Sequence, residues 1–328
     1  MTSAPQPLVS IRNLEVAFQA GAKTVQALNG VSLDVGRGET VALIGESGSG
    51  KSVTLRALMR LHPPRRTRMR GQMHVDGRDV LAMSARELAA MRGPVVSMVF
   101  QEPLLALDPV YTVGRQIEEM VRRHTGKTAA QARAHALALF ERVRIPSPER
   151  RLQAFPHEMS GGMRQRAMIA LALSCDPKVL LADEPTTALD ATVQIQILLL
   201  LRELQRELGL SIVFVTHDIG AAAEIADRVA VMYGGRIVEQ GAVADLLRAP
   251  RHPYTLALLK GRAHGAMQKG QRLETIPGSP PDLAALPPGC SFAPRCGLTQ
   301  PRCQAAVPDI EPIAPGHEVR CIRVAETA

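Results

Sequence analysis

The sequence predicts an α/β fold, and three observations support this prediction. Up to about residue 260, short apolar runs alternate with longer helical patterns, which is typical of a mostly parallel sheet covered on both faces. Near the start, residues 8–18 and 31–35 alternate between apolar and polar, as in an antiparallel, half-exposed sheet. Beyond residue 260 the chain is proline-rich, with ten of its 24 prolines between Pro277 and Pro315, so no long helix is expected there.

The individual elements follow from the lengths of these patterns. Four apolar runs bounded by polar residues or glycine have the length of buried strands, at 41–44, 95–100, 179–182 and 212–215. Four longer segments have helical patterns, at 51–61, 128–143, 163–174 and 192–208. We therefore place one domain at 1–260, with a mostly helical subdomain at about 102–175, and a small extension at 261–328.

Composition excludes several classes of protein. The chain has 328 residues, 46% hydrophobic and 21% charged, so it is neither disordered nor fibrous. The formal net charge of +8 allows an acidic partner but selects none. Aromatic residues make up only 3%, with no tryptophan, which argues against recognition of single strands by base stacking.

The sequence also bears on location. A spanning helix needs roughly 20 apolar residues, and the longest aliphatic run covers only 197–201. Residues 1–10 lack the basic start and apolar stretch of a signal peptide. We therefore expect a cytosolic chain, in which five cysteines do not form a disulfide framework.

The strongest motif is a glycine-rich loop between the strand at 41–44 and the helix at 51–61. It reads Gly45-Glu46-Ser47-Gly48-Ser49-Gly50-Lys51-Ser52 and matches G-x-x-x-x-G-K-S in the expected strand–loop–helix context. Its backbone N–H groups and the helix N-terminus can cradle phosphates. We expect Lys51 to reach the β- and γ-phosphates and the Ser52 hydroxyl to bind Mg²⁺.

Three further strands each end in a polar side chain. Asp183 and Glu184 follow the strand at 179–182; we expect Asp183 to hold Mg²⁺ and Glu184 to act as the general base on the attacking water. His217 follows 212–215 and can hydrogen-bond the γ-phosphate and this water. Gln101 follows 95–100, and its amide oxygen could join the Mg²⁺ shell, although a plain surface turn explains it equally well.

A second phosphate-binding element precedes the helix at 163–174. Ser160, Gly161 and Gly162 form another glycine-rich helix start. Because Lys51 and Ser52 already serve one γ-phosphate, this site suggests a nucleotide that is held by another chain.

Together these residues resemble the nucleotide-binding subunit of ABC transporters over about residues 8–260. Gly45 to Ser52 resembles its Walker A motif, Gln101 its Q-loop, 160–165 its signature, 180–184 its Walker B motif, 188–190 its D-loop and His217 its switch histidine. Phe18 occupies the position of the aromatic residue that stacks on adenine. The resemblance implies an ABC-type P-loop NTPase core with an N-terminal antiparallel β subdomain, a helical signature subdomain and a small Pro/Cys-rich C-terminal extension.

The resemblance also implies an assembly. In this family two ATPase domains pair head to tail around two ATPs, closing on ATP and opening after hydrolysis. The implied partners are two permease subunits, a second ABC ATPase that is a paralogue or an identical chain, and indirectly an extracytoplasmic binding protein, with no nucleic acid. The implied place is the cytoplasmic face of the inner membrane.

The tail narrows the resemblance. The segments 252–255, 276–281 and 289–296, with 190–194 after the D-loop, look like those of peptide-import ATPases of the dipeptide, oligopeptide and nickel uptake group. The implied activity is ATP hydrolysis that powers peptide uptake, with nickel or glutathione as alternative cargo.

Four of the five cysteines lie in the last 39 residues: Cys290, Cys296, Cys303 and Cys321. Four thiolates in a proline-rich segment with little core suit zinc or an iron–sulfur cluster as a staple. Zinc sites usually have closer cysteine pairs, whereas this spacing resembles that of peptide-import ATPases with a [4Fe–4S] cluster. The cluster, zinc and free thiols all stay open. Cys175, in an apolar helical stretch, is expected to pack in the core.

Two other classes of function stay open. One is a nucleic-acid-associated ABC ATPase, suggested by the basic run 65–70, although the long coiled coils or paired heads of such proteins are lacking here. The other is a regulatory subunit that binds nucleotide without hydrolysis, which the presence of Glu184 and His217 opposes.

Overall fold

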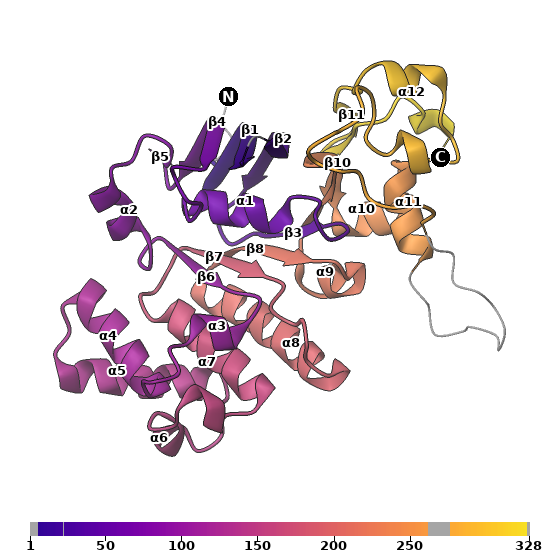
Figure 1. The fold of residues 1–328 in the computed structure, drawn as a ribbon. Helices are drawn as coiled ribbons and strands as arrows, with labels where there is room; N and C mark the ends of the chain where they lie inside the picture. The colour runs from indigo at the N-terminus through magenta and orange to yellow at the C-terminus, as the bar shows by residue number, and fades with distance from the viewer. Residues whose placement is uncertain (1–5, 22, 262–275, 327–328) are drawn as a thin grey trace, which may run out of the picture. The chain divides into compact units, whose positions relative to one another are not determined.

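A computed structural model describes residues 6–21, 23–261 and 276–326 (Figure 1). These residues fall into two compact units. Unit 1 contains the segment that ends at Leu8, Val35–Thr40 and Val75–Val215. Unit 2 contains Val9–Asp34, Val41–His74 and the chain from Thr216 onward. Each unit has its own buried core.

Unit 2 begins with the antiparallel sheet that the segments 8–18 and 31–35 predict. Its strands in this unit are β1 (Val9–Ala20), β2 (Lys23–Val35) and β4 (Thr67–Val75), in the order β2-β1-β4, of which β4 was not predicted. The last residues of β2 alternate between buried and half-buried, as the alternation at 31–35 predicts. The strand β2 is longer than predicted, because pairing continues back to Lys23, where the side chains are exposed.

A second sheet in unit 2 has the order β11-β12-β10-β9-β3. Its strands are β3 (Thr40–Ile44), β9 (Arg228–Tyr233), β10 (Arg236–Ala242), β11 (Glu311–Ala314) and β12 (His317–Val319). The pair β3–β9 is parallel, whereas β9–β10, β10–β12 and β11–β12 are antiparallel. Two strands of the C-terminal extension thus continue a sheet of unit 2, an arrangement that the proline-rich sequence did not predict.

The helices of unit 2 are short. They are α1 (Lys51–Leu58), α9 (Ile219–Ile225), α10 (Val243–Arg248), α11 (Pro253–Lys260) and α12 (Pro301–Ala305). The helix predicted at 51–61 ends at Leu58, where Met59 leaves the helical conformation. In the described part of the extension, α12 is the longest helix, as the prolines predict.

Unit 1 contains a parallel sheet of β6 (Val96–Val99), β7 (Val179–Asp183) and β8 (Ser211–Thr216). All residues of β7 and β8 are buried, which explains their unbroken apolar sequences. The three strands predicted in this region are confirmed to within one or two residues.

The remaining described elements of unit 1 are a 3₁₀ helix at Pro156–Glu158, a short strand and seven α-helices. The strand and the α-helices are β5 (Arg78–Asp79), α2 (Ala85–Met91), α3 (Pro103–Ala106), α4 (Val113–Thr125), α5 (Ala129–Arg142), α6 (Pro148–Arg151), α7 (Gly161–Leu173) and α8 (Ala191–Leu208). Local capping fixes several ends: Thr128 forms a capping box with Gln131, and Gly209 ends α8 with a φ of +62°. The helices α4 and α5 pack on each other and on α7, within the predicted helical subdomain.

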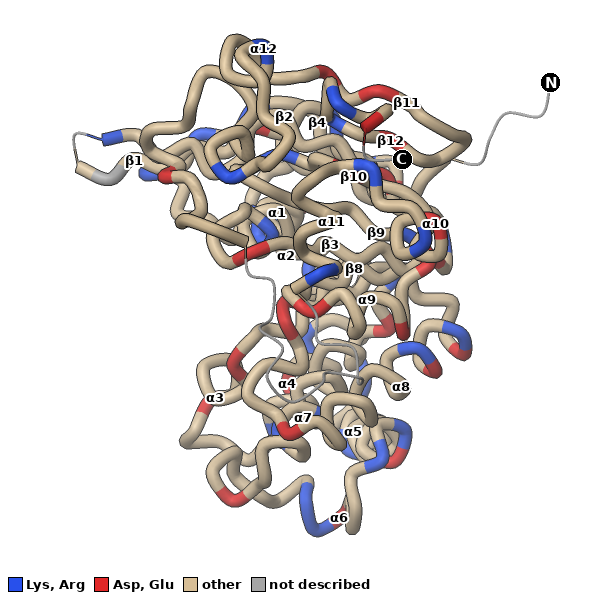
Figure 2. Tube along the Cα trace, turned by 90° about the vertical axis from the view of Figure 1, so that its right-hand side faces the viewer, with Lys and Arg blue, Asp and Glu red and all other residues tan. Residues whose placement is uncertain are grey.

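The distribution of charge and the lengths of the helices bear on function. Figure 2 shows Lys and Arg interspersed with Asp and Glu along the trace, rather than gathered in one basic stripe. Within the described ranges, no helix combines the length and apolarity that crossing a bilayer requires.

A buried carboxylate ties the extension into unit 2. Glu239 on β10 is fully buried and accepts hydrogen bonds from the backbone N–H groups of Arg251 (2.8 Å) and His252 (2.9 Å), just before α11. One of its oxygens also lies 2.8 Å from Nε2 of His317 on β12. Glu239 therefore links β10, the start of α11 and a strand of the extension.

We expect Glu239→Ala to destabilise the protein by roughly 3 kcal/mol or more, because two buried N–H groups and His317 would lose their acceptor. The measurement is the free energy of unfolding from a urea titration. The control is Glu311→Ala on β11, where the side chain is exposed and the expected change is within about 0.5 kcal/mol. Equal effects of the two substitutions would contradict this account of Glu239.

Candidate functional site

The glycine-rich loop leaves β3 through a position that only glycine can occupy. Gly45 has a φ of +151°, and a Cβ there would collide with the carbonyl oxygen of Met232 on β9 and lie 2.9 Å from Oγ of Ser49. The loop then runs into α1, which begins at Lys51. The strand–loop–helix context predicted from the sequence is confirmed, and successive loop N–H groups precede a helix N-terminus.

The ammonium group of Lys51 lies against its own loop. The side chain is 5% exposed, and Nζ donates hydrogen bonds to the carbonyl oxygens of Gly45 (2.7 Å) and Glu46 (2.9 Å). A lysine in this position can exchange carbonyl contacts for phosphate oxygens without crossing the loop.

Two other predicted residues lie in unit 2. Phe18 on β1 is half-buried, and the centroid of its ring lies 5.0 Å from that of His62 in a T-shaped arrangement. Burial lowers the pKa of His62, which favours the neutral ring at this contact. His217 is exposed directly after β8, while the next residue, Asp218, caps α9 through the N–H of Gly220 at 2.7 Å.

The predicted carboxylates lie in unit 1 at the end of β7. Asp183 is fully buried. Glu184 has a φ of +45°, which is strained for a side chain of its kind. Its N–H donates to the carbonyl of Val215 (3.0 Å), and its carboxylate accepts from Oγ1 of Thr187 (2.9 Å). These contacts hold Glu184 in this conformation.

Gln101 lies beside Glu184, as expected for residues that end the adjacent strands β6 and β7. Its Nε2 is 3.4 Å from a carboxylate oxygen of Glu184, which is a long hydrogen bond. The amide oxygen of Gln101 is then the group left to approach a cation.

The predicted glycine-rich start of α7 packs on the D-loop segment. Ser160 caps α7 by accepting the N–H of Met163 (3.3 Å), and Asp190 caps α8 by accepting the N–H of Val193 (2.9 Å). A Cβ on Gly162 would lie 2.9 Å from a methyl carbon of Val193, so a small residue is needed there. A Cβ on Gly161 would lie 3.5 Å from Cδ2 of Leu189, so the signature segment also packs on the D-loop segment.

One part of the site was not predicted from the sequence, namely the contact between the loop and the C-terminal region. The N–H of Glu46 donates to the hydroxyl of Tyr254 on α11 (2.8 Å), and its carboxylate pairs with both terminal nitrogens of Arg295 (2.6 and 3.0 Å). The only sequence signal was that Tyr254 and Arg295 lie in the tail segments that carry the resemblance to peptide-import ATPases.

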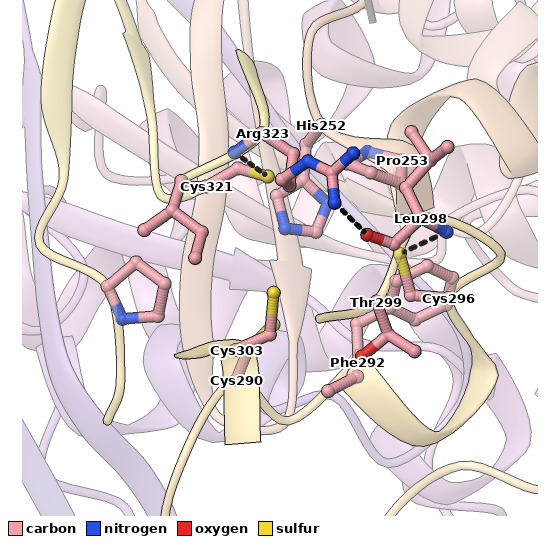
Figure 3. Close-up of a pocket in the computed structure, with 13 residues that line it drawn as sticks. His252, Pro253, Cys290, Phe292, Cys296, Leu298, Thr299, Cys303, Cys321 and Arg323 are labelled. Atoms are coloured by element: carbon pink, nitrogen blue, oxygen red, sulfur yellow. Dashed lines mark hydrogen bonds between the residues drawn. The ribbon is translucent and has the colours of Figure 1, made fainter. Parts of the chain in front are cut away.

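The four cysteines of the extension line one small cavity, together with His252 (Figure 3). Its volume is about 20 Å³, room for a group of about the size of a water molecule. Backbone N–H groups point at two of the sulfur atoms, from Leu298 to Cys296 (3.4 Å) and from Arg323 to Cys321 (3.3 Å). Four sulfur donors and N–H···S hydrogen bonds fit the chemistry of a thiolate-bound metal.

In the described part of the chain, however, these side chains are not arranged so that they could hold a metal ion without moving. Among residues 6–21, 23–261 and 276–326, no three His, Cys, Asp or Glu side chains are close enough to hold an ion. Burial raises the pKa of Cys290 and Cys296, and raises that of Cys321 to about 11, which favours neutral thiols. Cys175, by contrast, is buried in unit 1, as predicted for a packing residue.

His252 adds an unusual feature to this cavity. The side chain is 1% exposed, and burial lowers its pKa to about 3, so the ring is neutral. Nδ1 accepts the N–H of Tyr254 (3.1 Å), which leaves the proton on Nε2. Among the described residues, Nε2 is buried with no hydrogen-bond partner.

Comparisons with known proteins decide the family. The model of the ABC transporter family matches residues 28–187, and the model of the oligopeptide/dipeptide transporter C-terminal region matches 238–303. A Brucella melitensis protein named as a peptide import ATP-binding protein is 48% identical over 98% of this chain and 99% of its own. The chain belongs to the ABC transporter ATPases. A Sinorhizobium fredii protein named as a peptide ABC transporter ATP-binding protein is 46% identical over 96% of this ATPase and 95% of its own length.

Solved structures support the assignment of the fold. The dimeric ABC transporter cassette MJ0796 is similar to this ATPase with a TM-score of 0.64 and 29% identity, over 72% of this chain and 98% of that one. A second structure of that cassette, in a post-hydrolysis state bound to ADP and Pi, is similar with a TM-score of 0.64, 30% identity and the same coverage. The predicted ABC-type core is thus confirmed.

The geometry of the glycine-rich loop leads to a prediction about stability. We expect Gly45→Ala to lower the free energy of unfolding without nucleotide by about 3 kcal/mol or more, because the new methyl collides with the Met232 carbonyl. The matched control is Gly48→Ala, where a Cβ meets nothing within 4 Å and only the positive φ of +77° costs about 1 kcal/mol. Equal losses would show that the Met232 carbonyl does not dictate glycine at 45.

Proposed function

We propose that this ATPase is the ATP-hydrolysing subunit of an ABC importer that takes up peptides across the cytoplasmic membrane. The main support for the proposal is that one chain matches two family models. Residues 28–187 match the ABC transporter family, and residues 238–303 match the oligopeptide/dipeptide transporter C-terminal region. Relatives aligned over nearly the whole chain carry peptide-import names, which supports the same cargo here.

ATP binding rests on the glycine-rich loop and Phe18. The N–H groups of Gly45 to Ser52 surround the phosphates, and the exposed part of the Phe18 ring stacks on adenine. Lys51 leaves the carbonyl oxygens of Gly45 and Glu46 and pairs with the β- and γ-phosphates. The Ser52 hydroxyl, the Gln101 amide and the Asp183 carboxylate offer the oxygen ligands that Mg²⁺ prefers.

Hydrolysis rests on Glu184 and His217. A bound Mg²⁺ would neutralise charge on the phosphates. Glu184 accepts the proton of the attacking water, and its strained backbone and its contact with Thr187 fix the direction of the carboxylate. His217, which is exposed, donates a hydrogen bond to the γ-phosphate.

A second ATPase chain completes each site. Ser160, Gly161 and Gly162 form the exposed or half-exposed N-terminus of a 13-residue helix, and this second phosphate-binding element serves the ATP of the partner chain. The close packing of Gly161 against Leu189 links the signature segment to the D-loop segment. The partner chain is a paralogue or an identical copy.

Two permease subunits dock on the helical part of unit 1, which holds the ATPase on the cytoplasmic face of the membrane. Large apolar side chains are exposed there between Gln101 and α4, namely Leu104, Leu105, Val110 and Tyr111, with Leu105 82% exposed. Arg115 stacks over the ring of Tyr111 at 4.3 Å, which positions one edge of this patch. Exposed apolar groups in one short segment are typical of a protein interface.

We further propose that Cys290, Cys296, Cys303 and Cys321 hold a [4Fe–4S] cluster. The four thiols share one cavity with the buried Nε2–H group of His252, which can donate to an electron-rich sulfur. A cluster would need more room than the cavity volume of about 20 Å³, so the four thiols would have to separate to hold it. Its role is structural or redox-sensing.

We expect Glu184→Gln to lower ATP turnover in the assembled transporter by about 100-fold or more, with ATP binding retained, because the amide cannot accept the proton of the water. The measurement is phosphate release together with nucleotide binding. The control is Glu207→Gln on the exposed face of α8, with unchanged turnover. Turnover of the Glu184 variant near the wild-type rate would refute the assignment of the base.

We expect anaerobically purified protein to contain iron and acid-labile sulfide, and Cys321→Ser to lose most of both, because the cluster requires four thiolates. Iron and sulfide assays with absorption spectra provide the measurement. The control is Cys175→Ser, which keeps its iron because that thiol is buried in unit 1. Colourless wild-type protein with one equivalent of zinc would instead establish a zinc site.

A further inference from the structure

Glu46 connects the glycine-rich loop to two parts of unit 2. Its carbonyl oxygen accepts a hydrogen bond from Nζ of Lys51 (2.9 Å), on the nucleotide side. Its N–H donates to the hydroxyl of Tyr254 (2.8 Å), and its carboxylate forms a two-point pair with Arg295. Each polar group of Glu46 is therefore engaged, and a shift of Arg295 changes the position of a residue that contacts the catalytic lysine.

Arg295 is held firmly in this position. The side chain is 6% exposed, and Nε donates to the carbonyl of Pro277 (2.7 Å) while one terminal nitrogen donates to the hydroxyl of Tyr233 (3.1 Å). The rings of Tyr233, Tyr254 and Phe292 pack together with centroids 4.5 to 5.3 Å apart. The pair is planar, has two contact points and is buried on the Arg295 side, so it fixes the relative position of its two partners as well as their charges.

The turn that carries Arg295 forms part of the wall of the cysteine-lined cavity, through Ala293. A short 3₁₀ helix, Ala293–Arg295, lies between Cys290 and Cys296. The N–H of Ala293 donates to the carbonyl of Cys290 (3.0 Å), and the N–H of Cys296 donates to the carbonyl of Ala293 (3.3 Å). Both cysteines are therefore hydrogen-bonded through their backbones to the turn that carries Arg295.

We propose that the cysteine-lined cavity controls the ATP affinity of the glycine-rich loop through the Arg295–Glu46 pair. The packing or occupancy of the cavity determines the position of the turn at 293–295. The turn directs Arg295 toward Glu46, and Glu46 in turn determines the conformation of the loop in which Lys51 binds phosphate. The inference rests on the proposed ATP site, but it does not depend on which group the cysteines hold.

The test is a double-mutant cycle on the full chain, with the Kd for ATP as the readout. We expect Arg295→Met to raise this Kd about tenfold. Cys296→Ser raises it about threefold in the wild-type background and not at all in the Arg295→Met background, because the pair that transmits the effect is gone. An equal increase in both backgrounds, or an unchanged Kd for Arg295→Met, overturns the proposal.

Two controls and a second cycle secure this test. Cys175→Ser and Arg302→Met, on the exposed face of α12, leave the Kd unchanged. If Arg295→Met does not fold, as judged by thermal melting, the same cycle is run with Glu46→Gln, which breaks the pair from the loop side; Cys321→Ser likewise replaces a poorly folded Cys296→Ser. A wild-type chain that binds no ATP refutes the proposed function itself.

Discussion

The close approach of the Met232 carbonyl to Gly45 is the constraint on which the nucleotide site depends. It excludes every side chain at residue 45, and with a φ of +151° it turns the chain out of β3 and into the phosphate-binding loop. The turn places the carbonyl oxygens of Gly45 and Glu46 where Lys51 can rest on them. The resting position of the Lys51 ammonium group therefore depends on the close approach between Gly45 and β9.

Strain at Glu184 has a comparable role in unit 1. A left-handed conformation at a non-glycine residue costs of order 1 kcal/mol or more, and it persists only where other contacts compensate for that cost. Here the backbone bond to Val215 and the hydroxyl of Thr187 provide these contacts. The strained residue is the one whose carboxylate is the proposed general base. A fixed orientation of the Glu184 carboxylate is consistent with that role.

Local sequence patterns predicted most of the fold and the strand–loop–helix context of the glycine-rich loop. The strands at 41–44, 179–182 and 212–215 are buried runs whose burial on both faces leaves a continuous apolar sequence, and the loop at Gly45 has a fixed spacing. The pairing of β12 with β10 and the contact of Arg295 with Glu46 were not predictable. The two partners in that contact are 249 positions apart, and neither residue has a neighbour pattern that identifies the other.

The unpredicted contacts change the interpretation of the low aromatic content. Of three tyrosines in the whole chain, Tyr233 and Tyr254 pack on each other and on Phe292 of the extension. This concentration of scarce, bulky side chains gives the proline-rich segment a core that it could not form alone. Because Tyr233 ends β9 directly after Met232, the same strand end packs against the extension and shapes the phosphate-binding loop. The extension therefore helps to position the glycine-rich loop and is not only an addition to the ATPase domain.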